Sequence, residues 1–142
     1  MTGVVPIGHV HSGCTDPELL PPQSLDNIAA IGSVVIREDL VDALLGLDRY
    51  EYLWLLTWLH AEPIESQSPP LQLVPRATEA TGEVQGVFAS RAPHRPNPIG
   101  LSLVHNRGVR GNVVEFAGVD LLDGTPVLDI KPWFADADEP SR

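Results

Sequence analysis

Fourteen prolines and twelve glycines are spread along the 142 residues of this chain, and they restrict its fold more than any other feature. Proline fixes its own φ and breaks helices, and glycine weakens the interiors of helices and strands. Because these residues interrupt the chain so often, few segments are long enough for a helix of many turns. The spacing therefore favours short strands joined by defined turns over a helical bundle.

The apolar segments between the prolines and glycines predict a series of short strands. We expect strands at residues 4–10, 29–36, 52–60, 71–74, 86–89, 101–106, 113–121 and 127–130. Segment 52–60 is the most hydrophobic and is predicted to be the central buried strand. Leucines at helical spacing predict one helix of two to three turns over residues 38–47. Together these elements indicate a mostly β fold, a barrel or a sandwich, with one or a few short helices.

The length of the chain and its single cysteine limit the class of protein. One domain is expected over residues 1–135, followed by a frayed acidic tail over 136–142. Cys14 stands alone, so no disulfide framework or cysteine-based metal site is predicted. The sequence has no apolar run long enough for a membrane helix and no secretory signal pattern. We therefore expect a cytoplasmic protein without a membrane partner.

Charge is distributed unevenly along the chain. The net charge is −10, with −8 in residues 1–75 and a balance of zero in residues 76–131, which hold six of the nine basic side chains. A protein that binds nucleic acid through its overall field is expected to be basic. Any contact with RNA would therefore need a local basic patch, helped by a partner or by a second subunit.

Segment 86–102 places three prolines between two apolar runs, and it carries Arg91, His94, Arg95 and Asn97. Each proline also pushes the preceding residue toward extended geometry, so the loop is stiff. A stiff loop has already lost much of the entropy that ligand binding costs. The polar side chains therefore suit a binding site. The alternative is a rigid crossover in which they bond to nearby backbone.

Three other places carry groups suited to chemistry. The turn at residues 122–125 (Leu-Asp-Gly-Thr) gathers backbone amides and a carboxylate, which suits a ribose or an amino group, although taken alone it is better explained as a hairpin turn. His60 ends an apolar run, either as a functional imidazole or as a histidine bonded to backbone. Asp129 and Lys131 alternate on one strand face, where an ion pair is as plausible as a site.

Several common sites are not indicated by the sequence. His9 and His11 share one face of a predicted strand, but no third ligand follows at a recognisable spacing, so no metal site is expected. The glycine patterns of dinucleotide-binding and P-loop proteins do not occur. The nucleophile elbow Gly-x-Ser-x-Gly is also missing.

Two long motifs resemble one family closely. They are Gly-Val-Phe-Ala-Ser-Arg-Ala-Pro-His-Arg-Pro-Asn-Pro-Ile-Gly-Leu-Ser (residues 86–102) and Leu-Asp-Gly-Thr-Pro-Val-Leu-Asp-Ile-Lys-Pro-Trp (residues 122–133), with Pro6-Ile7-Gly8 as a weaker echo. Over nearly its whole length the chain is similar to the TsaA/TrmO-type S-adenosylmethionine-dependent methyltransferases. These methylate N6-threonylcarbamoyladenosine beside the tRNA anticodon. The resemblance implies a small antiparallel β-barrel, usually a homodimer, with S-adenosylmethionine as cofactor and tRNA as partner.

The resemblance also assigns roles to residues. It implies that the cofactor is bound by Pro21, Pro22, Gln23, His60, Arg91, Leu101, Leu122, Asp123, Gly124 and Thr125. By its charge, Arg91 is suited to bind the carboxylate of the cofactor, and Asp123 is suited to bind its hydroxyl and amino groups. The acceptor side is assigned to His94, Arg95, Asn97 and Lys131. No dedicated base is identified, and His60 and Asp129 are the candidates for taking a proton.

The chain departs from the family pattern at three places. Ala61 replaces the glutamine of a His-Gln pair, and Pro22 stands where arginine is common. The chain also ends at Arg142, without the C-terminal extension of the longer bacterial members. These departures keep two alternatives open: methyl transfer to a small metabolite, and a barrel that binds S-adenosylmethionine without catalysis.

Overall fold

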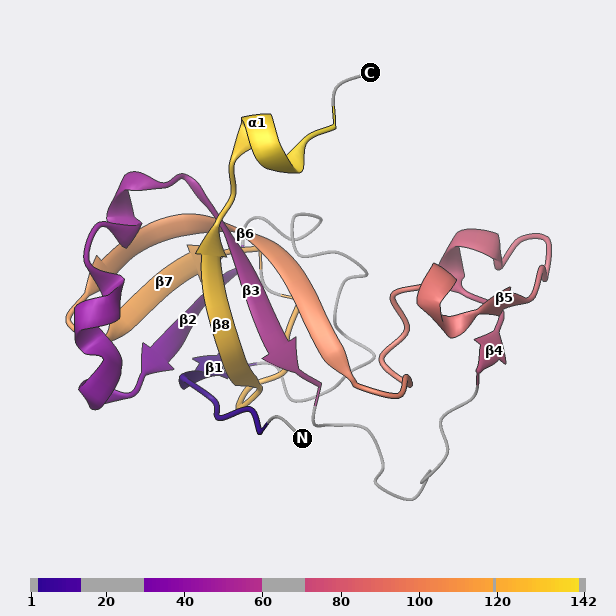
Figure 1. The fold of residues 1–142 in the computed structure, drawn as a ribbon, viewed down its shortest axis with the longest axis horizontal. Coiled ribbons are helices and arrows are strands. Elements are labelled where there is room, and N and C mark those ends of the chain that lie inside the picture. Colours follow the sequence, from indigo (N-terminus) through magenta and orange to yellow (C-terminus); the bar gives the residue numbers. More distant parts are fainter. Residues whose placement is uncertain (1–2, 14–29, 60–70, 119, 141–142) are drawn as a thin grey trace.

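The computed structural model describes residues 3–13, 30–59, 71–118 and 120–140. In this part of the chain six strands close an antiparallel barrel in the order β1-β2-β7-β6-β3-β8 (Figure 1). They span Gly8–His11 (β1), Ile31–Ile36 (β2), Tyr52–Trp58 (β3), Ile99–Arg110 (β6), Val113–Ala117 (β7) and Pro126–Pro132 (β8). The mostly β prediction and the implied barrel are confirmed.

Inward-facing side chains fill the barrel and form its core. The fully buried ones are Val10, Val34, Leu53, Leu55, Val104, Val114, Phe116 and Val127. Most of them are β-branched or aromatic, the types that pack well on a pleated surface. The interior is therefore a packed core, and any ligand must bind at an end of the barrel or on its outer face.

β3 lies between β6 and β8, but every strand of the closed barrel has two neighbours, so the predicted central position does not apply. β3 is also not buried on both faces, since its side chains alternate between the core and the outside. Three of the outward side chains, Tyr52, Trp54 and Trp58, are aromatic, and the first two have partners there. Tyr52 contacts the rings of His105 and Trp133 edge to face, and Trp54 Nε1 donates a hydrogen bond to Asp138 at 3.1 Å. This outer aromatic contact explains the continuous apolar run in the sequence.

β6 is twelve residues long, longer than the predicted strand at 101–106. It continues through a bulge between Asn106 and Gly108, where Gly108 has φ +125°. The hairpin to β7 then turns at Gly111 and Asn112. The bulge gives the strand the curvature that closing a small barrel requires.

The barrel closes through a short seam between its first and last strands. β1 and β8 are paired only at Gly8 with Val127 and at His9 with Pro126. By comparison, β3 and β6 are matched at seven positions. Backbone hydrogen bonds from Ile7 to Val127 (2.8 Å) and from Val10 to Thr125 (2.9 Å) extend the seam at both ends.

The two Pro-Ile-Gly sequences have the same structural role. Gly8 and Gly100 both lie at the beginning of a barrel strand, close against a neighbouring strand. A Cβ on Gly8 would overlap the carbonyl oxygen of Val35, and a Cβ on Gly100 would overlap the hydroxyl of Thr57. Glycine is therefore required at both positions by close packing, not by an unusual φ.

The predicted helix at 38–47 is present as two shorter pieces. Both are 3-10 helices, Glu38–Leu44 (η3) and Leu47–Arg49 (η4). Gly46, with φ +85°, separates them. Leu40, Leu44 and Leu47 pack against the core cluster, so the leucine spacing correctly marks the face that covers the barrel.

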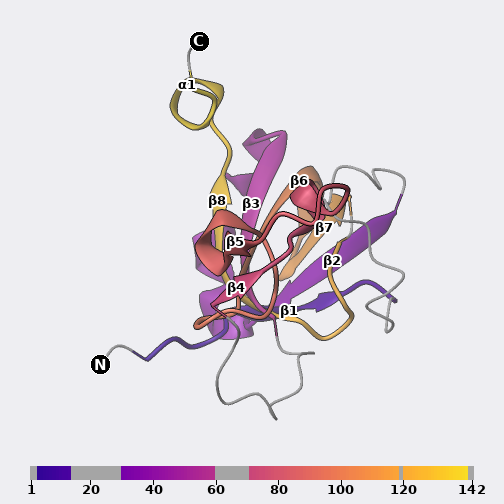
Figure 2. The same cartoon turned by 90° about the vertical axis from the view of Figure 1, so that its right-hand side faces the viewer.

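Residues 71–95 form a lobe beside the barrel. It contains the two-stranded ribbon of Gln72–Leu73 (β4) and Gln85–Gly86 (β5), with the 3-10 helices Arg76–Thr78 (η5) and Val87–Ala89 (η6). The predicted strand at 86–89 is thus mostly a 3-10 turn. Figure 1 shows the lobe to the right of the barrel, and Figure 2 shows it in front of the strands. The lobe ends in the proline-rich loop that leads into β6.

The chain leaves the barrel through a short helix, Ala135–Asp138 (α1), at the border of the predicted domain and tail. Asp138 accepts hydrogen bonds from Trp54 and from the backbone N–H of Phe134, so it links this segment to β3. None of the helices in the described ranges is long and apolar enough to cross a lipid bilayer.

Candidate functional site

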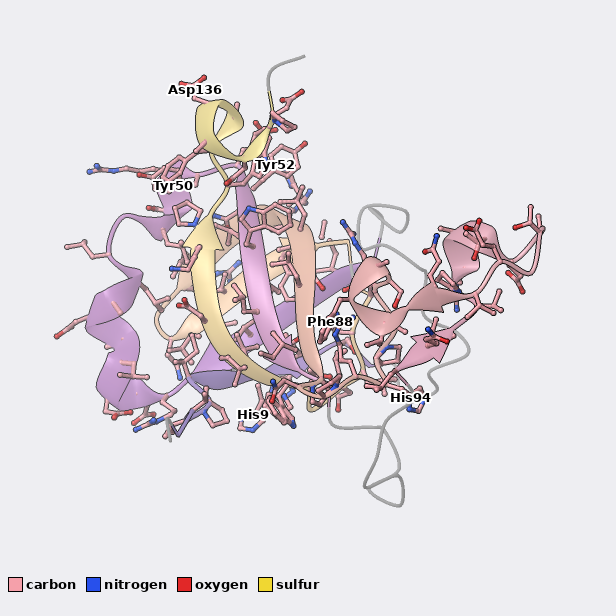
Figure 3. The ribbon with its side chains drawn as sticks, turned by 45° about the vertical axis from the view of Figure 1, so that its right-hand side comes forward. His9, Tyr50, Tyr52, Phe88, His94 and Asp136 are labelled. Carbon is pink, nitrogen blue, oxygen red and sulfur yellow. The ribbon has the colours of Figure 1, made fainter. Side chains whose placement is uncertain are left out.

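Predicted site residues gather at one end of the barrel. In Figure 3, Tyr50, Tyr52 and Asp136 lie at one end, whereas His9 and His94 lie at the other. The end with His94 receives the proline-rich loop before β6 and the connection from β7 to β8. We take this end as the candidate site and call it the loop end.

The turn at 122–125 is anchored to β1 at the loop end. Gly124 has φ +84° and donates its N–H to the carbonyl of Val10 at 2.7 Å. Asp123 Oδ1 accepts a hydrogen bond from the N–H of Ser12 at 3.1 Å and lies 4.0 Å from His11 Nδ1. Because β7 and β8 are not neighbours in the barrel, the turn is not a hairpin turn. It belongs to a crossing connection and presents the Asp123 carboxylate half exposed.

The proline-rich loop is held by its own side chains. Arg95 donates hydrogen bonds from Nη1 to the carbonyls of Ser90 (3.0 Å) and Ala92 (3.2 Å). The carbonyl of Asn97 accepts a hydrogen bond from the N–H of Ile99 at 2.7 Å. Arg95 thus bonds to nearby backbone, as the alternative interpretation of this loop expected. Its assignment to the acceptor side stays a prediction.

Asp120 is the functional candidate that sequence analysis missed. Its Oδ1 accepts a 2.8 Å hydrogen bond from the hydroxyl of Ser102, a buried residue of β6. Burial raises the pKa of Asp120 to about 6, against the opposing effects of the Ser102 hydrogen bond and of the positive charge of Arg91. Asp120 therefore links β6, the strand after the proline-rich loop, to the connection that carries the turn at 122–125. The one signal in the sequence is a serine at an inward position of a strand.

The raised pKa makes folding stability depend on pH. The folded chain binds the Asp120 proton more tightly than the unfolded chain does, so between about pH 4 and 6 the folded state carries more protons. Stability should therefore fall as the pH rises through this window, by up to about 3 kcal/mol from this group. Urea unfolding from pH 4 to 7.5, compared between wild type and Asp120→Asn, isolates the contribution. The same dependence of the free energy of unfolding on pH in both proteins would contradict this prediction.

Other predicted residues lie on the outer face of the barrel. Leu101, Leu56 and Asp129 are adjacent across β6, β3 and β8, and Leu101 is 53% exposed. Lys131 Nζ is 3.5 Å from Asp129 Oδ2, so the expected ion pair is present. The structure therefore does not bring Leu101, Asp129 and Lys131 into the group formed by Arg91, Asp120 and the turn. Pro21, Pro22, Gln23 and His60 lie outside the described residues.

The arginine side chains of residues 76–131 are divided between two places. Arg76, Arg91 and Arg95 belong to the lobe and the proline-rich loop, whereas Arg107 and Arg110 lie near the turn of the β6–β7 hairpin, at the far left of Figure 1. A hollow of about 300 Å³ on this hairpin is lined by Arg107, Gly108, Val109, Arg110, Val113 and Glu115. It contains none of the predicted site residues and lies away from the loop end.

The chain resembles known proteins over most of its length. Residues 9–139 match the family model of the tRNA-methyltransferase O N-terminal domain. The sequence is 44% identical over 100 residues to the mouse tRNA (adenine(37)-N6)-methyltransferase, which covers 70% of this chain and 22% of the mouse protein. It is 40% identical over 103 residues to a probable S-adenosyl-L-methionine-binding protein of Methanothermobacter thermautotrophicus, covering 72% of this chain and 69% of that protein.

Solved structures agree with these sequence matches. A crystal structure of TrmO from Pseudomonas aeruginosa superposes with a TM-score of 0.78 at 36% identity and covers 99% of this chain. The match covers 60% of the Pseudomonas chain, so the present chain spans less than two thirds of that relative and less than a quarter of the mouse protein.

Proposed function

This chain belongs to the family of the tRNA-methyltransferase O N-terminal domain, and on that basis we propose that it is an S-adenosylmethionine-dependent methyltransferase. The proposed acceptor is the N6 nitrogen of N6-threonylcarbamoyladenosine in tRNA. The observation that supports the proposal is the loop end, where the hydrogen bond between Ser102 of β6 and Asp120 joins the strand that follows the proline-rich loop to the connection that carries the turn at 122–125. Two motifs that are separate in the sequence thus contribute to one place.

The side chains at the loop end fit the charges of S-adenosylmethionine. Arg91 suits the carboxylate of the methionine part, and the half-exposed carboxylate of Asp123 suits its amino group or a ribose hydroxyl. When bound, S-adenosylmethionine supplies a methyl group activated by its sulfonium. The protein then needs to align donor and acceptor and exclude water.

Partners and location are part of the proposal. We propose that Arg76 and Arg95, in the lobe and the proline-rich loop, contact the RNA backbone, because a net charge of −10 makes attraction of RNA by the overall charge of the protein unfavourable. We propose a homodimer in the cytoplasm. Exposed apolar side chains on the lobe support a dimer, among them Leu71 (71%) and Phe88 (80%). Light scattering of the purified protein tests the dimer, and a monomer mass would contradict it.

Two measurements test the activity. Calorimetric titration with S-adenosylmethionine and S-adenosylhomocysteine should give micromolar binding of both, despite Ala61 and Pro22. Transfer of labelled methyl groups to tRNA carrying N6-threonylcarbamoyladenosine should follow, and it should weaken steeply with salt. Binding without transfer to this tRNA would leave the small-metabolite and non-catalytic alternatives. No binding of either compound would overturn the methyltransferase proposal.

A further inference from the structure

A carboxylate at the loop end has no role in the site described so far. Asp120 lies in the connection from β7 to β8, two residues before the turn at 122–125, and it interacts electrostatically with Arg91 of the proline-rich loop. Its hydrogen bond to Ser102 in β6, the strand that follows the proline-rich loop, joins the two described segments that we assign to S-adenosylmethionine. None of the residues carried over from the family resemblance is Asp120 or its partner Ser102.

The surroundings of Asp120 are those of a group that can exchange a proton. Ser102, only 3% exposed, donates a 2.8 Å hydrogen bond to Asp120 Oδ1 and fixes the orientation of the carboxylate. Thr57, which faces the interior from the neighbouring strand, has a buried hydroxyl with no hydrogen-bond partner among the described residues. The interior near the loop end is thus locally polar, whereas the rest of the core is apolar.

The other described carboxylate proposed for proton transfer is placed less well. Asp129 faces the outside of the barrel, where its side chain is half exposed and lies 3.5 Å from the ammonium group of Lys131. Its Oδ1 also accepts a hydrogen bond from the N–H of Ile130 at 2.9 Å. Burial, by contrast, brings Asp120 close to the working range of a general base.

We propose that Asp120 is a catalytic residue that accepts the proton from the substrate nitrogen during methyl transfer. This inference rests on the proposed function. The nitrogen forms a bond to the methyl carbon, the bond from that carbon to sulfur breaks with its electron pair remaining on sulfur, and the N–H proton passes to the Asp120 carboxylate. The carboxylic acid then releases the proton to water. Ser102 is a positioning residue that holds the carboxylate toward the reacting nitrogen.

Asp120→Asn tests the proposal, with Asp136→Asn, an exposed carboxylate at the opposite end of the barrel, as the control. Asparagine keeps the shape of the side chain and can still accept the Ser102 hydrogen bond, but it cannot take the proton. Turnover on tRNA carrying N6-threonylcarbamoyladenosine should fall at least about 100-fold in Asp120→Asn. Its affinity for S-adenosylhomocysteine should stay within about threefold of wild type, and Asp136→Asn should keep full turnover.

The pH dependence separates catalysis from a structural effect. The turnover of wild type should rise with pH and level off above an apparent pKa near 6. The turnover of Asp120→Asn should not show this rise. A titration of Asp120 by ¹³C NMR, assigned by comparison with Asp120→Asn, gives the same pKa without any substrate. Ser102→Ala should raise the pKa seen in turnover and the pKa seen by NMR together, because the hydrogen bond that is lost favours the charged carboxylate of Asp120.

The outcomes distinguish this inference from the proposed function. If wild type transfers methyl groups and Asp120→Asn retains its turnover, the inference is wrong and the proposed function stands. The inference is also wrong if Asp120→Asn loses affinity for S-adenosylhomocysteine as steeply as it loses turnover, because Asp120 would then only organise the donor site. If wild type binds no S-adenosylmethionine, both are wrong.

Discussion

Replacing Arg91 by alanine should weaken the binding of S-adenosylmethionine about 10- to 150-fold, roughly 1.5–3 kcal/mol. A hydrogen bond between a guanidinium and a carboxylate is charge-assisted, and its loss leaves the carboxylate of the ligand without a partner in a partly shielded site. Calorimetric titration of the folded variant measures the effect. The substitution should also raise the pKa of Asp120 further, because the charge of Arg91 now lowers it.

Arg107→Ala is the control for this prediction. Arg107 is also an exposed arginine, but it belongs to the β6–β7 hairpin, away from the loop end. Removing it changes the net charge by the same amount and should leave the affinity for S-adenosylmethionine within about twofold of wild type. Equal losses of affinity in the two variants would indicate an effect of net charge and not a contact made by Arg91. An unchanged affinity in Arg91→Ala would exclude Arg91 from the donor site.

Replacing Gly8 by alanine should destabilise the fold by about 2–3 kcal/mol and lower Tm by roughly 6–12 °C. The added Cβ would overlap the carbonyl oxygen of Val35, and backbone cannot rotate away as a flexible side chain can. Gly8 is also paired on both sides, with Ile36 and with Val127. The strain therefore falls on the seam that closes the barrel. Urea and thermal unfolding measure the loss.

Gly86→Ala is the matched variant for the Gly8 substitution. Gly86 also lies in a strand and has φ −66°, but a Cβ there would meet only the carbonyl oxygen of Leu71, at an ordinary 3.9 Å. Its stability should change by less than about 0.5 kcal/mol. If Gly8→Ala is as stable as Gly86→Ala, the close contact between β1 and β2 is not a constraint in solution.

The strand-rich fold was predictable because its signals are local. Prolines, glycines and short apolar runs mark where each strand begins and ends, and the outcome agrees for the positions of the barrel strands. The details that differ depend on neighbours in space. The length of β6 depends on the bulge at Gly108, and the outward aromatic face of β3 depends on contacts with His105 and Trp133. Single-strand periodicity carries no information about such partners.

The candidate site was predictable only as separate pieces. The motifs pointed to Arg91 and to the turn at 122–125, and the hydrogen bond between Asp120 and Ser102 joins the segments that carry them. Asp120 itself was missed because its role depends on burial and on Ser102, which comes from another strand. Leu101 was assigned to the same site as Arg91, but strand alternation puts it on the outer face beside Leu56. Register, which decides this, cannot be read from one strand alone.

The short seam between β1 and β8 has a consequence for how the protein folds. It joins residues near position 8 to residues near position 127, so forming it closes a loop of almost the whole chain. Contacts between such distant segments cost the most chain entropy, and they form late when few bonds repay that cost. The turn at 122–125 is held by Val10 and Ser12 of the same β1 segment. We therefore expect the loop end to be assembled late in folding, so that a growing or partly folded chain has no complete site with which to capture S-adenosylmethionine.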